Sequence, residues 1–265
     1  MRLEALLRRL GEGELSGDGG TAVRGVTHDS RLVRPGNLFA AVPGEHAHGV
    51  QFVDQALAAG AAAVLSDRRR PPRLDVPWIK VREARRAMAR AAWILAGSPQ
   101  RKLKLIGVTG TNGKSTTAHL ISLILNAADE PTAFVGTLGV RLPDGSEIAS
   151  ERTTPEATDL GPLLRQALKS GATGVAMEVS SHALCQYRVA GLEFAVAVWT
   201  NLTRDHLDYH RDMESYFEAK RRLFTDHLAR GGRRVLPVED PWGARLLDRP
   251  REGDVSWGLD RGAVC

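Results

Sequence analysis

The chain has 265 residues, a length that suggests about two domains and allows one or two sizeable cores. Hydrophobic residues make up 43% and charged residues 25% of the sequence, which argues against a disordered chain. The net charge of +5 suits anionic ligands such as nucleotides. Aromatic residues are only 5% and do not interleave with a basic tract, which argues against a nucleic-acid-binding surface.

Cysteine content and hydropathy indicate the compartment. Two cysteines, Cys185 and Cys265, cannot build a disulfide framework, so we expect a reducing cytoplasm. Residues 1–10 space leucines at helical intervals between charges and lack the apolar core of a signal peptide. The longest apolar run, residues 56–65, is too short to cross a bilayer, so we expect no membrane insertion.

The first third of the chain predicts a small α/β domain. Strands are predicted at the short apolar runs 37–42, 61–65 and 78–81, and helices at 52–59 and 83–96. The sequence Gly97-Ser98-Pro99 stops the second helix and is followed by charged residues. We therefore expect one domain over residues 1–99 and a second over residues 100–265.

From Leu103 onward, strands alternate with helices, which predicts a mostly parallel, doubly wound sheet. Strands are predicted at 103–108, 132–140, 174–179, 194–200, 234–238 and 254–259, and helices at 114–127, 154–171 and 213–229. At residues 154–156, the order Thr-Pro-Glu is typical of a helix start with Thr154 as the N-cap. Because the chain ends after a strand-like segment with no closing helix, we expect the second domain to be incomplete.

A glycine-rich turn joins the first strand of this second domain to its first helix. It comprises Gly110, Thr111, Asn112, Gly113, Lys114, Ser115 and Thr116. Glycines let backbone N–H groups surround phosphate oxygens, and the new helix adds the positive end of its dipole. Lys114 would contact the β- and γ-phosphates and Ser115 would bind Mg²⁺. Val108 stands where the strict phosphate-loop pattern has its first glycine, and a chance Gly-Lys-Ser turn is the alternative, but the flanking strand and helix favour phosphate binding.

Three polar residues follow or end later strands, where ligands of open α/β sheets bind. Glu178 lies in an apolar strand, His206 follows the next strand, and Lys220 lies in the helix after that. Taken singly, an internal salt bridge, a capping loop and a solvated helix face would explain them. Together with the glycine-rich turn they suit ATP·Mg²⁺ chemistry, and their spacing leaves a kinase, an ATPase and a ligase open.

Over essentially its whole length, the sequence resembles the Mur ligase family. The matching motifs are residues 27–31, 35–39, 60–65, 110–116, 153–156, 177–182, 186–188, 200–210 and 218–220. The resemblance implies an ATP-dependent ligase of peptidoglycan precursor synthesis, in the cell wall pathway. It would add the third stem-peptide residue to UDP-N-acetylmuramoyl-L-alanyl-D-glutamate through an acyl phosphate, and that residue would be meso-diaminopimelate, our expectation, or L-lysine.

The resemblance also implies the roles of the two domains. Residues 1–99 would bind the UDP substrate, and residues 100–265 would form a truncated, P-loop-type ATPase domain. The C-terminal domain that binds the incoming amino acid is absent from this sequence. We therefore expect a monomer that does not complete the ligation alone.

Site residues follow from the resemblance position by position. Residues 110–116 would bind ATP, and the catalytic residues would be Lys114, Glu178, His206 and Lys220. Two Mg²⁺ ions would be held by Ser115, Glu178, His206 and Lys220, the last as a carbamate formed with CO₂. The UDP substrate would contact Ser30, Glu45, His46, Ala47, Thr153, Thr154, Ser180, Gln186 and Arg188.

Two positions depart from the family pattern. His48 stands where Asp is usual, in the expected substrate loop, and Pro237 replaces an Asn at a strand end. Since proline lacks a backbone donor, we expect Pro237 to reshape that edge of the nucleotide site. Two alternatives remain: a non-catalytic module that binds the UDP-sugar peptide or ATP, and a folylpolyglutamate synthetase, against which the motifs at 29–31 and 35–36 argue.

Overall fold

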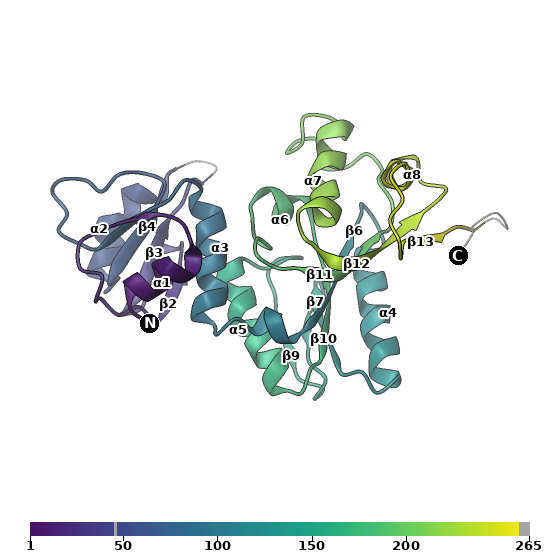
Figure 1. Cartoon of the computed structure of the whole chain (residues 1–265), viewed down its shortest axis with the longest axis horizontal. Helices are drawn as coiled ribbons and strands as arrows, with labels where there is room; N and C mark the ends of the chain where they lie inside the picture. The colour runs from purple at the N-terminus through teal and green to yellow at the C-terminus, as the bar shows by residue number, and fades with distance from the viewer. Residues whose placement is uncertain (45–46, 260–265) are drawn as a thin grey trace. The chain divides into compact units, whose positions relative to one another are not determined.

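The computed structural model describes residues 1–44 and 47–259, which separate into two compact units (Figure 1). The first unit is Met1–Ser98 together with Ala157–Pro162, and the second unit is the remainder of the described chain. Each unit has its own sheet with helices against it, so the prediction of an α/β protein with mostly parallel sheets is confirmed. In the described residues, no helix has the length and apolar character needed to span a bilayer.

The first unit is built on a five-stranded sheet. Its elements are α1 (Leu3–Leu10), β1 (Glu14–Ser16), β2 (Gly25–Thr27), β3 (Asn37–Ala41), α2 (Val53–Ala58), β4 (Ala63–Ser66), β5 (Trp78–Lys80) and α3 (Ala84–Leu95), with 3₁₀ turns at Ser30–Leu32 and Gly49–Phe52. The strand order is β1-β5-β4-β3-β2, in which only β1 pairs antiparallel. The sheet therefore has the mainly parallel form that crossover helices produce.

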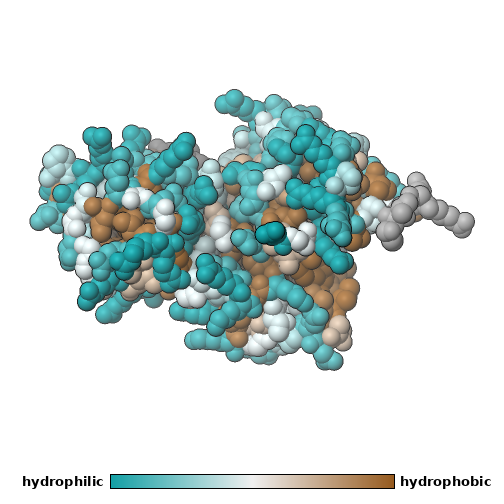
Figure 2. Space-filling model, viewed as in Figure 1, coloured by the Kyte–Doolittle hydropathy of each residue, from teal (hydrophilic) through white to brown (hydrophobic). Residues whose placement is uncertain are grey.

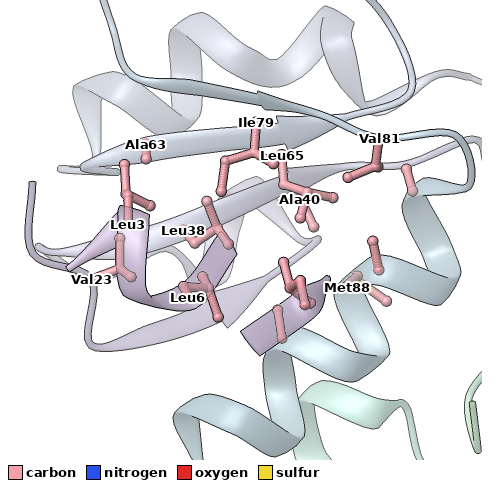
Figure 3. Packing of buried hydrophobic residues seen from close by; sticks show 14 of the residues in the cluster. Leu3, Leu6, Val23, Leu38, Ala40, Ala63, Leu65, Ile79, Val81 and Met88 are labelled. Carbon is pink, nitrogen blue, oxygen red and sulfur yellow. The ribbon is translucent and has the colours of Figure 1, made fainter. Parts of the chain in front are cut away.

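Alternation along β3 divides the core of the first unit into two layers. Leu38 and Ala40 pack on one face with Leu3 and Leu6 of α1 (Figure 3), and Phe39 packs on the other face with α2. Successive strand side chains point to opposite faces, so a strand buried on both sides is apolar throughout. This pattern explains why the run at 37–42 is continuous rather than alternating.

The second unit is built on an eight-stranded sheet of order β13-β12-β11-β6-β10-β7-β8-β9. Its strands are β6 (Lys104–Thr109), β7 (Thr132–Gly136), β8 (Gly139–Arg141), β9 (Glu147–Ile148), β10 (Gly174–Glu178), β11 (Phe194–Trp199), β12 (Leu228–Pro237) and β13 (Val255–Trp257). Its helices are α4 (Lys114–Ala127), the part of α5 (Ala157–Lys169) that follows Pro162, α6 (Ser181–Cys185), α7 (Met213–Thr225) and α8 (Pro241–Leu247), with a 3₁₀ turn at Pro99–Lys102. Because β10, β6 and β11 are parallel neighbours, their carboxyl ends meet at one edge of the sheet.

Helix α4 packs on this sheet through Ala118 and Ile121, against Val108, Phe134 and Val198. Its opposite side is also apolar, since Leu120, Leu123 and Ile124 are exposed, and Figure 2 shows hydrophobic surface in this region. The helix is therefore apolar beyond the single stripe that its packing on the sheet requires.

Three local predictions are wrong. The extended segment predicted at 132–140 is a hairpin, in which β7 and β8 pair antiparallel. Helix α5 begins at Ala157 rather than after Thr154, and its N-cap is Glu156, because the Thr154 hydroxyl accepts from the Ser180 N–H instead of from a helix N–H. The helix predicted at 213–229 ends at Thr225, and its last residues begin β12 instead.

Pro237 does not interrupt the sheet. It is the last residue of β12 and stands opposite Trp257 of β13, while the following Val238 N–H donates to the Trp257 carbonyl at 2.9 Å. The ladder therefore continues past the proline, because the next residue supplies the donor that proline lacks.

Candidate functional site

The glycine-rich turn lies at the carboxyl end of β6, directly before α4. At Gly110 the backbone has φ 149°, and a Cβ placed there would lie 1.9 Å from the Thr200 hydroxyl oxygen. Gly113 precedes the first helical residue with φ 81°. A side chain would clash at Gly110 and would be strained at Gly113, so glycine at both positions keeps the backbone of the turn open to a ligand at the start of the helix.

A second loop, residues 200–203 after β11, holds the turn in shape. The Asn112 N–H donates to the Asn201 side-chain oxygen at 3.0 Å, and the Thr200 hydroxyl donates to the Asn112 carbonyl at 2.7 Å. The Thr111 N–H donates to the Asn201 carbonyl at 2.9 Å, and the Thr203 N–H donates to the Thr111 hydroxyl at 3.0 Å. Residue-by-residue reading of the sequence missed this support, because it depends on contacts across about 90 positions.

The Lys114 side chain folds back onto the turn that precedes it. Its ammonium donates to the carbonyls of Gly110 and Thr111, at 3.1 and 2.9 Å. Burial lowers the pKa of Lys114, while Glu178 and Asp205 oppose that shift. The cation is thus held by the turn that would surround a phosphate group.

Glu178 ends β10 with its side chain buried, at 1% relative exposure. It accepts hydrogen bonds from the Thr137 N–H at 2.7 Å and from the Thr137 hydroxyl at 3.3 Å. A Cβ at Gly136 would lie 2.1 Å from its Oε1, so a glycine makes room for the carboxylate. Across the described ranges, Glu178 forms no ion pair within 4.0 Å, and the internal salt bridge considered for it is wrong.

Lys220 is also buried, at 1% relative exposure, on α7. Its Nζ donates to the Gly110 carbonyl at 2.6 Å and lies 4.6 Å from the centre of the Tyr216 ring. Burial, together with the Lys114 charge, lowers the pKa of Lys220 well below its ordinary value. A solvated helix face is therefore the wrong interpretation of this lysine.

His206 is more exposed and sits in the left-handed region with φ 51°. Its ring lies 4.9 Å from the His182 ring and 6.1 Å from the Tyr216 ring, centre to centre. Behind it, His210 stacks on Tyr216 and bonds through Nε2 to the Ser181 hydroxyl at 2.9 Å. Burial, with the nearby His182, lowers the pKa of His210 to about 4, so this ring is neutral at pH 7.

Five residues predicted to contact the UDP substrate gather near the end of β10. The Thr153 hydroxyl accepts from the Thr137 hydroxyl at 3.0 Å, and the Ser180 side chain caps α6. The Thr154 hydroxyl accepts from the Ser180 N–H at 3.1 Å. Their backbone and hydroxyl contacts bring the motifs at 153–156 and 177–182 together.

Arg188 and Gln186 are joined to the same region. The buried Arg188 guanidinium donates to the Thr154 carbonyl at 3.0 Å and to the Gln186 side-chain oxygen at 2.7 Å. It also forms a buried ion pair with Glu156 at 2.9 Å. Arg188 therefore connects the 153–156 motif to Gln186 through buried contacts.

The remaining substrate-contact predictions belong to the first unit. The Ser30 hydroxyl donates to the Gln55 side-chain oxygen at 2.8 Å, and the Ala47 carbonyl accepts from the Gly44 N–H at 2.9 Å. Glu45 and His46 lie outside the described residues. At the departing position, His48 caps the 3₁₀ turn at Gly49–Phe52 by accepting from the Val50 N–H, which leaves its other nitrogen to donate to Asp67 at 2.8 Å.

The donor set near the turn suits a hard divalent cation in part. No group of three His, Cys, Asp or Glu side chains within residues 1–44 and 47–259 is arranged to hold a metal. A cation there would need other oxygens, such as a hydroxyl or phosphate, besides Glu178. The buried Glu178 carboxylate, which has hydrogen-bond donors but forms no ion pair with any described residue, fits such a site because Mg²⁺ combines one or two carboxylates with substrate phosphates.

Two family models match the chain. The model described as Mur ligase middle domain matches residues 108–261, and the model described as Mur ligase family, catalytic domain, matches residues 22–93. Together they cover most of both units.

Curated relatives and solved structures match nearly the whole chain. A protein of Geobacter metallireducens named UDP-N-acetylmuramoyl-L-alanyl-D-glutamate--2,6-diaminopimelate ligase is 46% identical over 98% of this chain and 52% of its own length. One of the same name from Gloeobacter violaceus is 48% identical over 93% of this chain and 50% of its own length. The chain thus spans about half the length of the curated relatives it matches.

A solved structure with that same enzyme name has a TM-score of 0.79 at 27% identity, over 99% of this chain and 53% of the other. MurF from Acinetobacter baumannii has a TM-score of 0.66 at 20% identity, over 99% of this chain and 53% of its own, which shows a shared fold.

Proposed function

The chain belongs to the Mur ligase family, and we propose that it carries the nucleotide- and UDP-substrate-binding parts of an ATP-dependent ligase. The ligase joins 2,6-diaminopimelate to UDP-N-acetylmuramoyl-L-alanyl-D-glutamate, as the names of its relatives state for those proteins. Such a reaction, in peptidoglycan precursor synthesis, takes place in the cytoplasm, where ATP and nucleotide sugars are found. The observation that carries this proposal is the meeting of the glycine-rich turn with the buried Lys220 amine at the Gly110 carbonyl.

The turn at 110–116 would bind the phosphates of ATP. Its backbone N–H groups and the start of α4 provide donors and a positive dipole, and Lys114 adds a cation. On binding, Lys114 would exchange the carbonyls of Gly110 and Thr111 for phosphate oxygens, which are stronger acceptors. Bound Mg²⁺ would neutralise phosphate charge during phosphoryl transfer.

Ser115, Glu178 and His206 would hold the magnesium ions, together with Lys220 as a carbamate. The buried amine of Lys220 supports that modification, because a lowered pKa provides the neutral nitrogen that adds to CO₂. The neutral nitrogen forms a bond to the carbon of CO₂ as one C–O π bond opens onto oxygen, and it loses one proton to solvent, which converts a neutral amine into an anionic oxygen ligand. A buried lysine beside Lys114 then becomes favourable rather than costly.

For the UDP substrate, we propose contacts with Ser30, Ala47, Thr153, Thr154, Ser180, Gln186 and Arg188, and with Glu45 and His46. In the second unit, Arg188 would act mainly by orienting Gln186 and the Thr154 backbone. The γ-carboxylate of the D-glutamyl group would then attack the γ-phosphorus of ATP, which breaks the bond to the β-phosphate, releases ADP and gives an acyl phosphate. The amine of the incoming amino acid would displace phosphate from that acyl carbon and lose a proton to form the amide. Positioning and electrostatics carry this chemistry.

Two observations weigh against the alternatives. The first unit matches a Mur ligase model at residues 22–93, which supports a UDP-sugar substrate over a folate. The names of the relatives support diaminopimelate over L-lysine as the added residue.

Titration calorimetry of ATP with Mg²⁺ into the purified chain tests the nucleotide site. Replacing Lys114 by Ala removes charge-assisted bonds to phosphate, so we expect about 10- to 100-fold weaker binding. Lys104→Ala is the matched control, because this exposed lysine lies at the opposite end of β6, and it should bind as the parent does. Equal affinity for Lys114→Ala and the parent would contradict the proposed site.

Titration with UDP-N-acetylmuramoyl-L-alanyl-D-glutamate tests the second part of the proposal. Binding of this compound, with much weaker binding of UDP alone, supports a substrate site that reads the peptide. The non-catalytic alternative predicts a different result. The chain would bind ATP and this compound, but a longer protein that includes this chain would release no ADP when it is given both together with diaminopimelate.

A further inference from the structure

Asp240 follows β12 and caps α8, outside the groups discussed so far. Its carboxylate accepts from the Gly243 N–H at 2.6 Å and from the indole N–H of the buried Trp199 at 2.9 Å, both through Oδ2. Through Oδ1 it accepts from the Leu202 N–H at 3.2 Å. One side chain thus joins the start of α8 to the end of β11 and to the loop that follows it.

The loop that Asp240 holds is the one that supports the glycine-rich turn. Leu202 lies between Asn201 and Thr203, which bond to Asn112 and Thr111 respectively. Thr200, on the other side of Asn201, also bonds to Asn112. Hydrogen bonds at both ends, joined by the backbone of residues 200–203, therefore connect Asp240 to the turn.

The three donors at Asp240 need an acceptor-only group with two oxygens. An ionised carboxylate meets that need, whereas an amide offers one oxygen and places an NH₂ group in the other position. An Asn at this position would keep two bonds by directing its oxygen at Trp199 and Gly243. Its NH₂ would then face the Leu202 N–H, so a single substitution separates capping of α8 from support of the loop.

We propose that Asp240 is a positioning residue for the glycine-rich turn. By fixing the Leu202 backbone, it keeps Asn201 and Thr200 where they hold the Asn112 peptide group. The N–H groups of the turn are then oriented before phosphate arrives, and nucleotide binding does not have to order the loop. The consequence for nucleotide affinity rests on the proposed function, whereas the support of the turn does not.

The test compares Asp240→Asn with the parent chain by two measurements. Hydrogen exchange without nucleotide should show faster exchange of the Thr111 and Asn112 amides in the variant. Calorimetry with ATP and Mg²⁺ should show about fivefold weaker binding, the loss expected for one hydrogen bond. Removal of a negative charge would by itself strengthen the binding of an anion, so weaker binding identifies positioning rather than charge.

Asp212→Asn is the matched control. Asp212 caps α7 through the Ser215 N–H at 2.7 Å, so the same chemical change is made at another helix start in the same unit. We expect neither the exchange of the two amides nor the ATP affinity to change. Asp240→Ser serves as a second variant, because its hydroxyl can cap α8 but is too short to reach Leu202.

Unchanged exchange at Thr111 and Asn112 in both Asp240 variants overturns the inference. Faster exchange with unchanged ATP affinity overturns its consequence for binding. If the parent chain binds no ATP, the proposed function fails, while the exchange measurement still decides whether Asp240 supports the turn.

Discussion

The two units of this protein bury different kinds of side chain. In the described part of the first unit, the buried polar residues are serines, namely Ser30, Ser66 and Ser98. The second unit contains every buried charged side chain of the described chain: Glu156, Glu178, Arg188, Lys220 and Arg234. The core of the first unit is stabilised by apolar packing. The second unit buries charged side chains, although removing a charge from water costs free energy.

Those buried charges fall into two groups. Glu156 pairs with Arg188, and Arg234 pairs with Asp254, so these charges are compensated within the fold. Glu178 and Lys220 have hydrogen-bond partners but form no ion pair among the described residues. A buried charge without a counter-charge is costly, and this difference is the reason we propose that Glu178 and Lys220 serve a ligand.

The largest loss of stability is expected in the first unit. Leu38→Ala leaves a cavity between α1, α3 and the sheet, and should reduce the free energy of unfolding by about 3 to 5 kcal/mol. Hydrogen exchange of the first unit measures the loss, and Leu32→Ala, at an exposed position of the same unit, should cost under about 0.5 kcal/mol. ATP affinity should not change in Leu38→Ala. A loss of affinity as large as the loss of stability would contradict the view that the first unit does not take part in nucleotide binding.

The compensated pair in the second unit should give the next largest effect. Arg234 donates to both oxygens of Asp254 and to the carbonyls of Leu246 and Arg249, and Asp254→Asn breaks the ion pair. We expect a loss of about 2 kcal/mol near pH 7, measured by denaturant unfolding. Little change in the free energy of unfolding would show that the Arg234–Asp254 pair does not stabilise the second unit.

The same pair predicts a pH dependence. Burial alone would raise the pKa of Asp254, but the hydrogen bonds from Arg234 and the Arg251 N–H, together with the charges of both arginines, outweigh burial and lower that pKa below 3.8. The stabilisation is therefore present above the unfolded pKa of about 3.9, and disappears as the pH falls through the lower folded value. The parent and Asp254→Asn should differ at pH 7 and converge in acid, and a constant difference would contradict this origin.

An uncompensated charge should behave in the opposite way. Lys220→Met replaces a buried amine by an unbranched apolar chain, and the Gly110 carbonyl keeps Lys114 as a donor. We expect the unmodified chain to gain about 1 to 2 kcal/mol, measured by thermal unfolding in CO₂-depleted buffer. Lys169→Met, at an exposed position, should leave the midpoint unchanged, and a destabilised Lys220→Met would show that this lysine is structural.

The smallest change in stability is expected at Glu178. Gln keeps an oxygen for the Thr137 N–H and can donate its NH₂ group to the Thr137 hydroxyl. The weaker hydrogen bonds offset the relief of a buried charge, so the unfolding free energy should change by less than about 1 kcal/mol. The gain in ATP affinity that Mg²⁺ provides should fall by about tenfold, since one charged oxygen ligand is lost. Glu147→Gln, at an exposed residue of β9, is the control, and an intact Mg²⁺ effect in Glu178→Gln would remove Glu178 from the proposed metal site.

Local patterns predicted several elements of this fold well. Helix α4 was expected at 114–127 and has those bounds, because Gly113 marks its start and apolar side chains recur along its whole length. The N-cap predicted at Thr154 was wrong because the hydroxyl accepts from a donor 26 positions away, the Ser180 N–H. The hairpin at 132–141 was missed although Gly136 and Gly139, which pair with each other across the turn, could have marked the reversal.

The sequence by itself determined the parallel sheet, the glycine-rich turn and the residue types that can bind phosphate and magnesium, since these depend on short-range periodicity and backbone freedom. Only the tertiary structure decided that Lys220 is buried against the Gly110 carbonyl, that Glu178 has no cationic partner among the described residues, and that Asp240 supports the loop that holds Asn112. Burial and hydrogen-bond partners arise from strands that are adjacent in the sheet but distant in the chain, so no local pattern encodes them.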